Sequence, residues 1–127
     1  KHGIHVHGFP NLFLVQATQG ANLISNYPHN LVECARAIAI MIAHALETGA
    51  KEVEVTQEAQ DAWVELLLSG PGMLIGTPDC TPGYYNNEGQ PTEFAKYYVG
   101  YPHGAQAYFA YIDGWLKIGN FEGVDFR

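Results

Sequence analysis

The sequence predicts an α/β segment that is mostly helical, with one buried strand, about three helices and long ordered loops. Three observations lead to this prediction. Apolar residues recur at helical spacing in three stretches, a short apolar run at residues 12–15 is typical of a buried strand, and prolines interrupt residues 69–91. The 127 residues suffice for one compact core and are too few for two ordinary domains, so we expect residues 1–127 to form a single segment.

The first elements follow from local signals. A strand is predicted at Leu12–Val15, because this apolar run comes directly after a turn cluster of glycine, proline and asparagine. A loop of small and amide residues follows. The first helix is expected to begin near Pro28, with Asn26 or Ser25 as its cap, and to end at Gly49. Its apolar stripe, at offsets of three and four, consists of Leu31, Ala35, Ile38, Ile42 and Ala45.

Two further helices are predicted. Thr56 offers a cap for a helix from Gln57 to about Leu68, and the last helix runs from about Ala105 to Ile118 and stops at Gly119. The intervening Val53–Val55 is too short to be more than a strand stub or an extended linker. The residues expected to point inward from the second helix are Trp63, Leu66 and Leu67.

The single predicted strand indicates missing sequence. A lone strand leaves its backbone donors and acceptors unpaired, so the strand at residues 12–15 is expected to pair with a segment outside this chain. Only 15% of the residues are charged, whereas about a quarter is typical of a soluble domain. A piece of a larger protein and a subunit buried in an interface both fit this composition.

Charge and cysteine content limit the partners. The formal net charge of −7 excludes a protein that binds nucleic acid through clustered cations, and it gives no attraction to anionic membranes. No apolar run approaches the roughly 18 residues of a membrane span. Cys34 and Cys80 are too few for a disulfide framework, and we expect two reduced thiols in a cytoplasmic protein.

Self-contained chemistry is not visible. The glycine-rich run Ser69–Gly76 follows a helix and lacks the spacing of a phosphate loop, so it is interpreted as a helix stop and turn. His5 and His7 would point from the same face of an extended strand, but a metal site needs a third or fourth ligand. No cysteine, histidine or carboxylate elsewhere in the sequence has a suitable spacing, so no metal site is expected. No serine or cysteine stands in a nucleophile frame, and no catalytic residue is assigned to this chain.

Two segments remain as candidate binding sites. The loop Gln16–Asn22 lies between a predicted strand and a helix start, where exposed N–H groups bind cofactors in open α/β sheets. A plain connection is the alternative. The segment Cys80–Pro91 combines turn formers with two amides and the adjacent Tyr84 and Tyr85, which could line a ligand cleft or cover a neighbouring domain.

Two motifs in this order resemble a known family. GFPNLF at residues 8–13 and TPGYYNNEG at residues 81–89 look like the C-terminal segment of flavin-dependent Baeyer–Villiger monooxygenases, most of all the subgroup that acts on bulky or steroid-like ketones. The resemblance covers nearly the whole chain. It implies a segment that completes an FAD-binding domain, in an enzyme that uses FAD, NADPH and O2 to insert oxygen beside a ketone carbonyl and form an ester or lactone.

The resemblance also implies roles for individual residues. Those that would approach FAD are Gln16, Thr18, Gln19 and Gly20. Those that would line the substrate side are Leu23, Ile24 and Tyr27. Those that would cover the nicotinamide cofactor are Tyr84, Tyr85 and Asn86, although a tryptophan that many relatives carry in this loop has no counterpart between Cys80 and Pro91.

By the same resemblance, the catalytic residues and the dinucleotide fingerprints would lie outside this chain, and the rest of the same polypeptide would be its partner. The chain alone is then expected to be inactive. Two other interpretations stay open at this point: a segment of a flavin monooxygenase that oxidises nitrogen or sulfur, and a non-catalytic helical interaction module.

Overall fold

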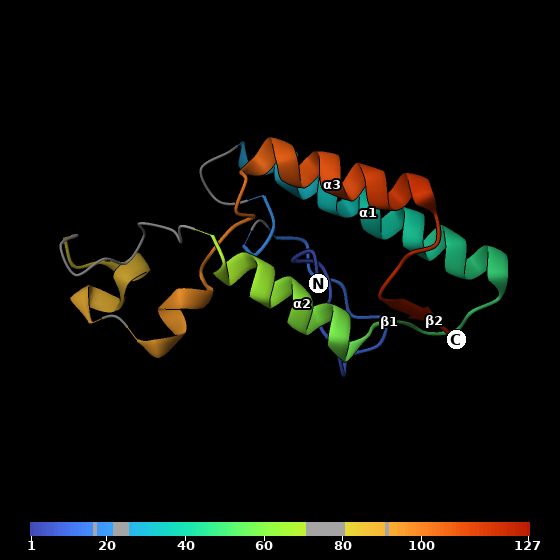
Figure 1. Ribbon diagram of the computed structural model, residues 1–127, viewed down its shortest axis with the longest axis horizontal. Helices are drawn as coiled ribbons and strands as arrows, with labels where there is room; N and C mark the ends of the chain where they lie inside the picture. Colours follow the sequence, from blue (N-terminus) through green and yellow to red (C-terminus); the bar gives the residue numbers. More distant parts are fainter. Residues whose placement is uncertain (17, 22–25, 71–80, 91) are drawn as a thin grey trace.

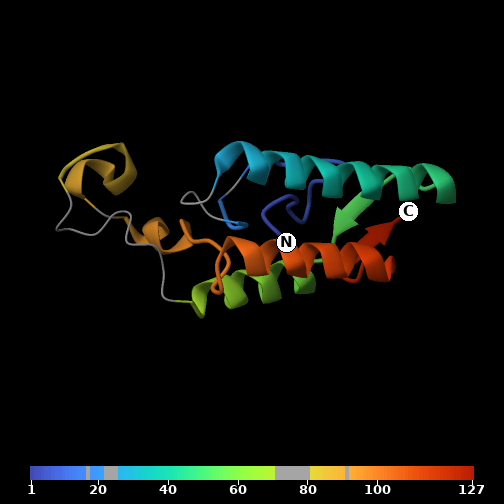
Figure 2. The same cartoon turned by 90° about the horizontal axis from the view of Figure 1, so that it is seen from above.

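The computed structural model describes residues 1–16, 18–21, 26–70, 81–90 and 92–127. In this part of the chain, α1 and α3 lie side by side above α2 in the view of Figure 1, and the N-terminal segment lies between α1 and the other two helices in Figure 2. A short sheet closes one end of the helical body. The elements in chain order are α1 (Tyr27–Thr48), β1 (Val53–Val55), α2 (Gln57–Leu68), the 3-10 turns η1 (Tyr84–Gly89) and η2 (Glu93–Tyr97), α3 (Ala105–Ile118) and β2 (Val124–Phe126).

The three helices confirm the sequence prediction, and their ends follow from local capping. The Asn26 side chain accepts a bond from the amide of His29, and Gly49 ends α1 in the left-handed conformation, at φ 77°. Thr56 caps α2 through the amide of Ala59, at 3.2 Å. Gly119 ends α3 at φ 73°. Each cap satisfies backbone groups that a helix end leaves without a partner inside the helix.

The sheet consists of two antiparallel strands, β1 and β2, with Glu54 opposite Asp125. The sequence left β1 undecided, and β2 was not predicted at all. Arg127 fixes the pairing, because its guanidinium contacts Glu54 at 2.6 Å and Glu52 at 3.2 Å. The guanidinium hydrogen bond also lowers the pKa of the Glu54 carboxyl below its usual value.

The strand predicted at Leu12–Val15 is wrong. Only Phe13 makes a bridge, to His5 of the same chain, and Leu12 and Val15 are 44% and 51% exposed. In the described residues, the bridge between Phe13 and His5 is joined only by the bond from the N–H of Leu14 to the carbonyl of Ile4, at 2.7 Å, so no longer ladder forms. The segment at residues 12–15 bonds within the chain, so the argument for missing sequence from an unpaired strand does not hold.

The N-terminal segment forms the centre of the core. His2, Ile4 and His5 are at most 4% exposed, and Figure 2 shows the segment between α1 on one side and α2 and α3 on the other. The buried side chains that surround it come from all three helices and from the chain between them. Among the largest contributions are those of Met41, Trp63, Leu67, Tyr108, Ile112 and Trp115.

The buried face of α1 is rotated from the predicted stripe. Ile38 and Ala45 are buried as expected, whereas Ala35 is exposed and Ile42 is 42% exposed. The helix buries Asn30, Cys34, Ala37, Ile38, Met41 and Ala45 instead. The prediction failed because α1 is apolar on both sides, so periodicity alone does not say which side meets the core.

The turn η1 lies apart from the helical body in both views, and η2 lies between η1 and that body (Figures 1 and 2). The sequence predicts an ordered loop over residues 69–91. Residues 71–80 lie outside the described residues, and the described part winds into short 3-10 turns. Tyr84 is 89% exposed and Phe94 is 62% exposed. No described helix is both long and apolar enough to cross a lipid bilayer.

His2 and His5 are buried without hydrogen bonds. Neither ring nitrogen of either imidazole has a partner in the described structure, and the His2 ring packs edge-on against Trp63 and Trp115, at centroid distances of 5.0 and 4.7 Å. Burial lowers the pKa of His2 well below its usual value and lowers that of His5 to about 3. Both imidazoles are therefore neutral in the fold near pH 7.

The two histidines should make stability depend on pH. Because their pKa is lowered in the folded state, their contribution is complete above the unfolded pKa of 6.5 and is lost as the pH falls toward 3. In the protein that carries this chain, we expect His5→Phe to remove up to about 2 kcal/mol of the loss in unfolding free energy between pH 6.5 and 5. Urea melts at both pH values measure the loss. The exposed control, His103→Phe, should keep the wild-type dependence; equal slopes for the two variants would contradict the prediction.

Candidate functional site

Gln19 is the most constrained residue of the predicted cofactor loop. Its backbone is left-handed, at φ 61°, which is uncommon for a residue other than glycine. Three bonds hold it there. Its N–H donates to the carbonyl of Val99 at 2.9 Å, its carbonyl accepts the indole N–H of Trp63 at 3.0 Å, and its side chain donates to the carbonyl of Tyr97 at 3.3 Å. Helix α2 and the chain before α3 thus fix this turn.

A glycine is needed at position 20 because the Tyr108 side chain lies close to its backbone. It is buried, and a Cβ at this position would lie 3.1 Å from the hydroxyl oxygen of Tyr108. That hydroxyl donates to the carbonyl of His2 at 2.8 Å, and burial raises its pKa well above the usual value, so it stays a neutral donor. The carbonyl of Gly20 accepts the N–H of Tyr101 at 2.8 Å. The loop therefore packs directly on α3.

Gln16 is attached to α1 and to the N-terminal segment. Its carbonyl accepts the thiol of Cys34 at 3.2 Å, and its side chain donates to the carbonyl of Gly3 at 3.4 Å. Cys34 is a free, buried cysteine, and burial raises the pKa of its thiol. It is thus a structural donor and not an activated nucleophile.

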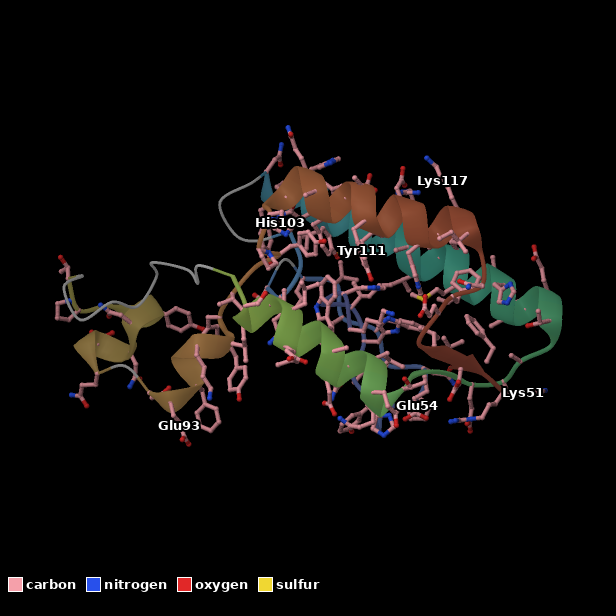
Figure 3. All side chains as sticks on the ribbon, in the orientation of Figure 1. Lys51, Glu54, Glu93, His103, Tyr111 and Lys117 are labelled. Atoms are coloured by element: carbon pink, nitrogen blue, oxygen red, sulfur yellow. The ribbon has the colours of Figure 1, made fainter. Side chains whose placement is uncertain are left out.

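The carbonyls of the loop accept hydrogen bonds within the chain, but some of its N–H groups have no acceptor among the described residues. The carbonyls of Gln16, Gln19 and Gly20 all accept bonds within the chain, whereas the N–H groups of Thr18 and Gly20 meet no acceptor among the described residues. In Figure 3, Tyr111 lies on the side of α3 that faces α2, and His103 lies just before α3. Trp63 and Tyr108 contact the loop itself, and two of its backbone donors meet no acceptor among the described residues.

The substrate-side residues are only partly described. Leu23 and Ile24 lie outside the described residues. Tyr27 begins α1 and is 45% exposed, and the start of α1 lies at the same end of the helical body as the loop at residues 18–21 (Figure 1). The structure therefore groups Gln16, Thr18, Gln19, Gly20 and Tyr27 at one end of the body.

The segment predicted to cover the nicotinamide cofactor lies elsewhere. Asn86 is 5% exposed, and its side chain accepts the N–H of Gly83 at 2.8 Å and of Gly89 at 3.1 Å while donating to Thr81 at 3.0 Å. These bonds hold its own turn together. The side chain of Tyr85 is not among the described ones, and the whole segment lies apart from the loop at residues 16–20 (Figures 1 and 2).

Comparison with known proteins identifies the relatives of this chain. The chain is 38% identical over 124 residues to the FAD-binding monooxygenase hmp7 of Hypomyces subiculosus, which covers 97% of the chain and 20% of that protein. It is 39% identical over 117 residues to a Baeyer–Villiger monooxygenase of Streptomyces coelicolor, covering 91% of the chain and 19% of the relative. Homologues of this chain are Baeyer–Villiger monooxygenases. No family model matches the chain.

The fold agrees with this relationship. The polycyclic ketone monooxygenase of Thermothelomyces thermophila superposes with a TM-score of 0.77 and 28% identity, over 99% of this chain and 20% of that one. A steroid monooxygenase bound to NADP shares the fold, with a TM-score of 0.72 at 20% identity. The chain spans about a fifth of the length of the Baeyer–Villiger monooxygenases and related enzymes that it matches.

Apart from the loop, this homologue of Baeyer–Villiger monooxygenases has a cluster of charged side chains between α1 and α3. A shallow groove of about 430 Å³ is lined by His29, Glu33, Arg36, Phe109, Ala110 and Asp113. Arg36 contacts Glu33 at 2.9 Å and Asp113 at 2.5 Å, and its hydrogen bond lowers the pKa of the Asp113 carboxyl. The charges compensate one another on the surface, as in a structural ion-pair network. The described residues contain no group of three potential metal ligands.

Sequence reasoning missed the residues that support the loop. It placed Trp63 on the inward face of α2, which is confirmed at 3% exposure, but it did not foresee the bond to Gln19. It likewise did not link Tyr108 to Gly20. These contacts join residues 44 and 88 positions apart, and no local pattern in a single sequence reports such pairs.

The contact between Gly20 and Tyr108 can be tested by adding one methyl group. Gly20→Ala should lower the free energy of unfolding by about 1–3 kcal/mol, since the new Cβ overlaps a buried and hydrogen-bonded hydroxyl. Gly114→Ala is the matched control: a Cβ there meets nothing within 4 Å, so it should stabilise α3 by about 0.5–1 kcal/mol. Chemical denaturation of the intact protein measures both. Equal effects of the two substitutions would show that the close approach has no energetic weight.

Proposed function

We propose that this chain is part of the FAD-binding domain of an NADPH-dependent Baeyer–Villiger monooxygenase, which inserts one oxygen atom from O2 beside a ketone carbonyl to give an ester or lactone. The observation that carries the proposal is 39% identity to a Baeyer–Villiger monooxygenase over 91% of the chain. The residues of this chain supply shape and backbone donors. Residues 1–127 then form one segment of the larger domain.

The loop at residues 16–20 fits a flavin. FAD, when bound, supplies the oxygen activation, and its isoalloxazine ring carries several carbonyl and nitrogen acceptors. The N–H groups of Thr18 and Gly20 lack acceptors among the described residues, while the carbonyls of Gln16, Gln19 and Gly20 are already occupied. A ring edge with acceptors complements such a loop. This arrangement supports Gln16, Thr18, Gln19 and Gly20 as the FAD-contacting residues.

The other roles are proposed by position. Tyr27 at the start of α1, with Leu23 and Ile24, would line the ketone site. Tyr84, Tyr85 and Asn86 would contact NADPH, with Asn86 acting through the turn that it holds and not through a free amide. For this second group to reach the flavin, the rest of the polypeptide has to bring the segment at residues 81–90 toward the cofactor. The steroid monooxygenase of the same fold binds NADP.

The comparisons favour ketone oxidation over the alternatives. The named relatives are monooxygenases, which gives no support to a non-catalytic helical interaction module. The polycyclic ketone monooxygenase, at 28% identity, supports a bulky ketone as the small-molecule substrate over an amine or a sulfide. We place the protein in the cytoplasm, where reduced thiols such as the free Cys34 persist, and we assign no nucleic-acid or membrane partner.

Turnover by the protein that carries this chain tests the proposal. We expect the purified protein to contain FAD and to oxidise NADPH in the presence of O2 and a polycyclic ketone, with an ester or lactone as the product seen by mass spectrometry. An amine and a sulfide of similar size serve as competing substrates. Oxidation of the amine or sulfide with no ester formation would favour the other flavin monooxygenases, and a colourless protein would contradict the proposal.

The outer face of α1 supports burial within a larger domain. Val32 and Leu46 on this face are 61% and 76% exposed, and Ile42 is 42% exposed. The residues between them on the same face, Ala35, Ala39 and Ala43, are small, apolar and exposed as well. A helix that is apolar on both sides is typical of a protein interior. We propose that another segment of the same polypeptide covers this face.

Lysine scanning tests this coverage. If Leu46 is covered in the whole protein, Leu46→Lys should cost more than about 2 kcal/mol of unfolding free energy, because it buries an unpaired charge. If Leu46 stays in water, the change should be within about 0.5 kcal/mol. Glu47→Lys, at the exposed neighbouring position, is the control that changes charge without apolar burial. Thermal or urea unfolding of the full-length protein distinguishes the two cases.

A further inference from the structure

Trp63 is a core residue that donates a hydrogen bond to a residue far away in the sequence. Its indole is 3% exposed, and its N–H reaches across 44 residues to donate to the carbonyl of Gln19 at 3.0 Å. The acceptor belongs to a left-handed residue in the loop proposed to contact FAD. A buried indole N–H needs an acceptor, and here that need is met by one particular peptide group.

The bond orients the donor on the other side of that peptide. The Gln19 carbonyl and the Gly20 N–H belong to the same planar unit, and no cis peptide occurs in the described chain. In a trans peptide, the C=O and the N–H point in opposite directions. Fixing the carbonyl toward Trp63 on α2 therefore fixes the Gly20 N–H away from α2. That N–H has no acceptor among the described residues.

The indole itself cannot easily turn. It stacks on Tyr101 at a centroid distance of 5.8 Å with an interplanar angle of 21°, and it meets His2 edge-on at 5.0 Å and Tyr111 at 5.8 Å. Rings on several sides hold the orientation of the N–H, so the bond to Gln19 does not depend on a mobile side chain. The aromatic cluster thus acts as a rigid support for the peptide of the loop.

We propose that Trp63 is a positioning residue for the flavin: through the Gln19 carbonyl it aims the Gly20 N–H at a hydrogen-bond acceptor of the isoalloxazine ring. This inference rests on the proposed function. Trp63 does not touch the cofactor. It holds the peptide that does, so its loss should change the affinity for FAD and the environment of the ring.

The test compares two tryptophans of the full-length, FAD-loaded protein. Trp63→Phe removes the N–H and keeps an aromatic ring. The matched control is Trp115→Phe, since Trp115 is 6% exposed and its N–H donates to the carbonyl of Glu122 at 3.2 Å, where the chain leaves α3 for β2. Both variants lose one indole hydrogen bond and similar volume. Only the first loses the contact with the loop.

For Trp63→Phe we expect a roughly 3- to 10-fold rise in the FAD dissociation constant, the range expected for one hydrogen bond, and a shift of the bound-flavin absorbance spectrum. Trp115→Phe should leave both within about twofold of wild type. If both variants melt earlier to the same degree and neither changes the flavin spectrum, Trp63 is only a core residue and the proposal is overturned. A wild-type protein that binds no FAD is a different result, because it overturns the proposed function itself.

A measurement on the wild type covers the case in which Trp63→Phe does not fold. Hydrogen exchange of the peptide that spans residues 18–21 should slow when FAD is added to the apoprotein, because the Gly20 N–H then acquires an acceptor. The peptide around Glu122 should not change. Unchanged exchange at residues 18–21 on FAD binding would overturn the proposal.

Discussion

The buried N-terminal segment is the constraint on which the rest of the fold depends. Residues 2–5 run between the helices, and the carbonyls of residues 2, 3 and 4 accept hydrogen bonds from other parts of the chain. The carbonyl of His2 accepts from Tyr108, that of Gly3 from Gln16, and that of Ile4 from the amide of Leu14. At Gly3, φ is 72° and a Cβ would lie 2.8 Å from the carbonyl oxygen of Thr18, so the loop at residues 16–20 can approach only because this position has no side chain.

The N-terminal segment is one of several elements that hold the described residues of the candidate site in place. The loop at residues 16–20 rests on the N-terminal segment below it, on α1 through Cys34, on α2 through Trp63 and on the chain before α3 through Val99 and Tyr101. Three of these contacts end on loop carbonyls, those of Gln16, Gln19 and Gly20. The N–H groups of Thr18 and Gly20 meet no acceptor among the described residues, and they are the donors that we propose for a ligand.

Local signals predicted the helices, and longer-range contacts explain the failures. Asn26, Thr56, Gly49 and Gly119 determine helix ends from within one turn, so the three helices were predicted nearly to the residue. The strand predicted at residues 12–15 was wrong because, among the described residues, this run pairs with just one bridge to His5 and one bond to the carbonyl of Ile4. The β1–β2 pair joins residues about 70 positions apart, and its second strand was missed because three residues give too short a pattern.

In the candidate site, too, contiguous residues were predicted and contacts between distant residues were missed. Gln16, Thr18, Gln19 and Gly20 were predicted together because they are contiguous, and the resemblance to the Baeyer–Villiger family named them. Tyr84–Asn86 were predicted to join the same cofactor region, yet within this chain they lie apart from it. Trp63 and Tyr108 support the loop from distant positions and left no local signal. Within the described residues the chain thus contributes a loop held by distant aromatic side chains, and it spans about a fifth of the length of the relatives that it matches.

A structure of the full-length protein with FAD bound tests this account most directly. The account predicts a hydrogen bond between the Gly20 N–H and an acceptor atom of the isoalloxazine ring, with the Trp63 indole still bonded to the Gln19 carbonyl. A flavin ring seated elsewhere, with the Gly20 N–H facing protein or water, would contradict it.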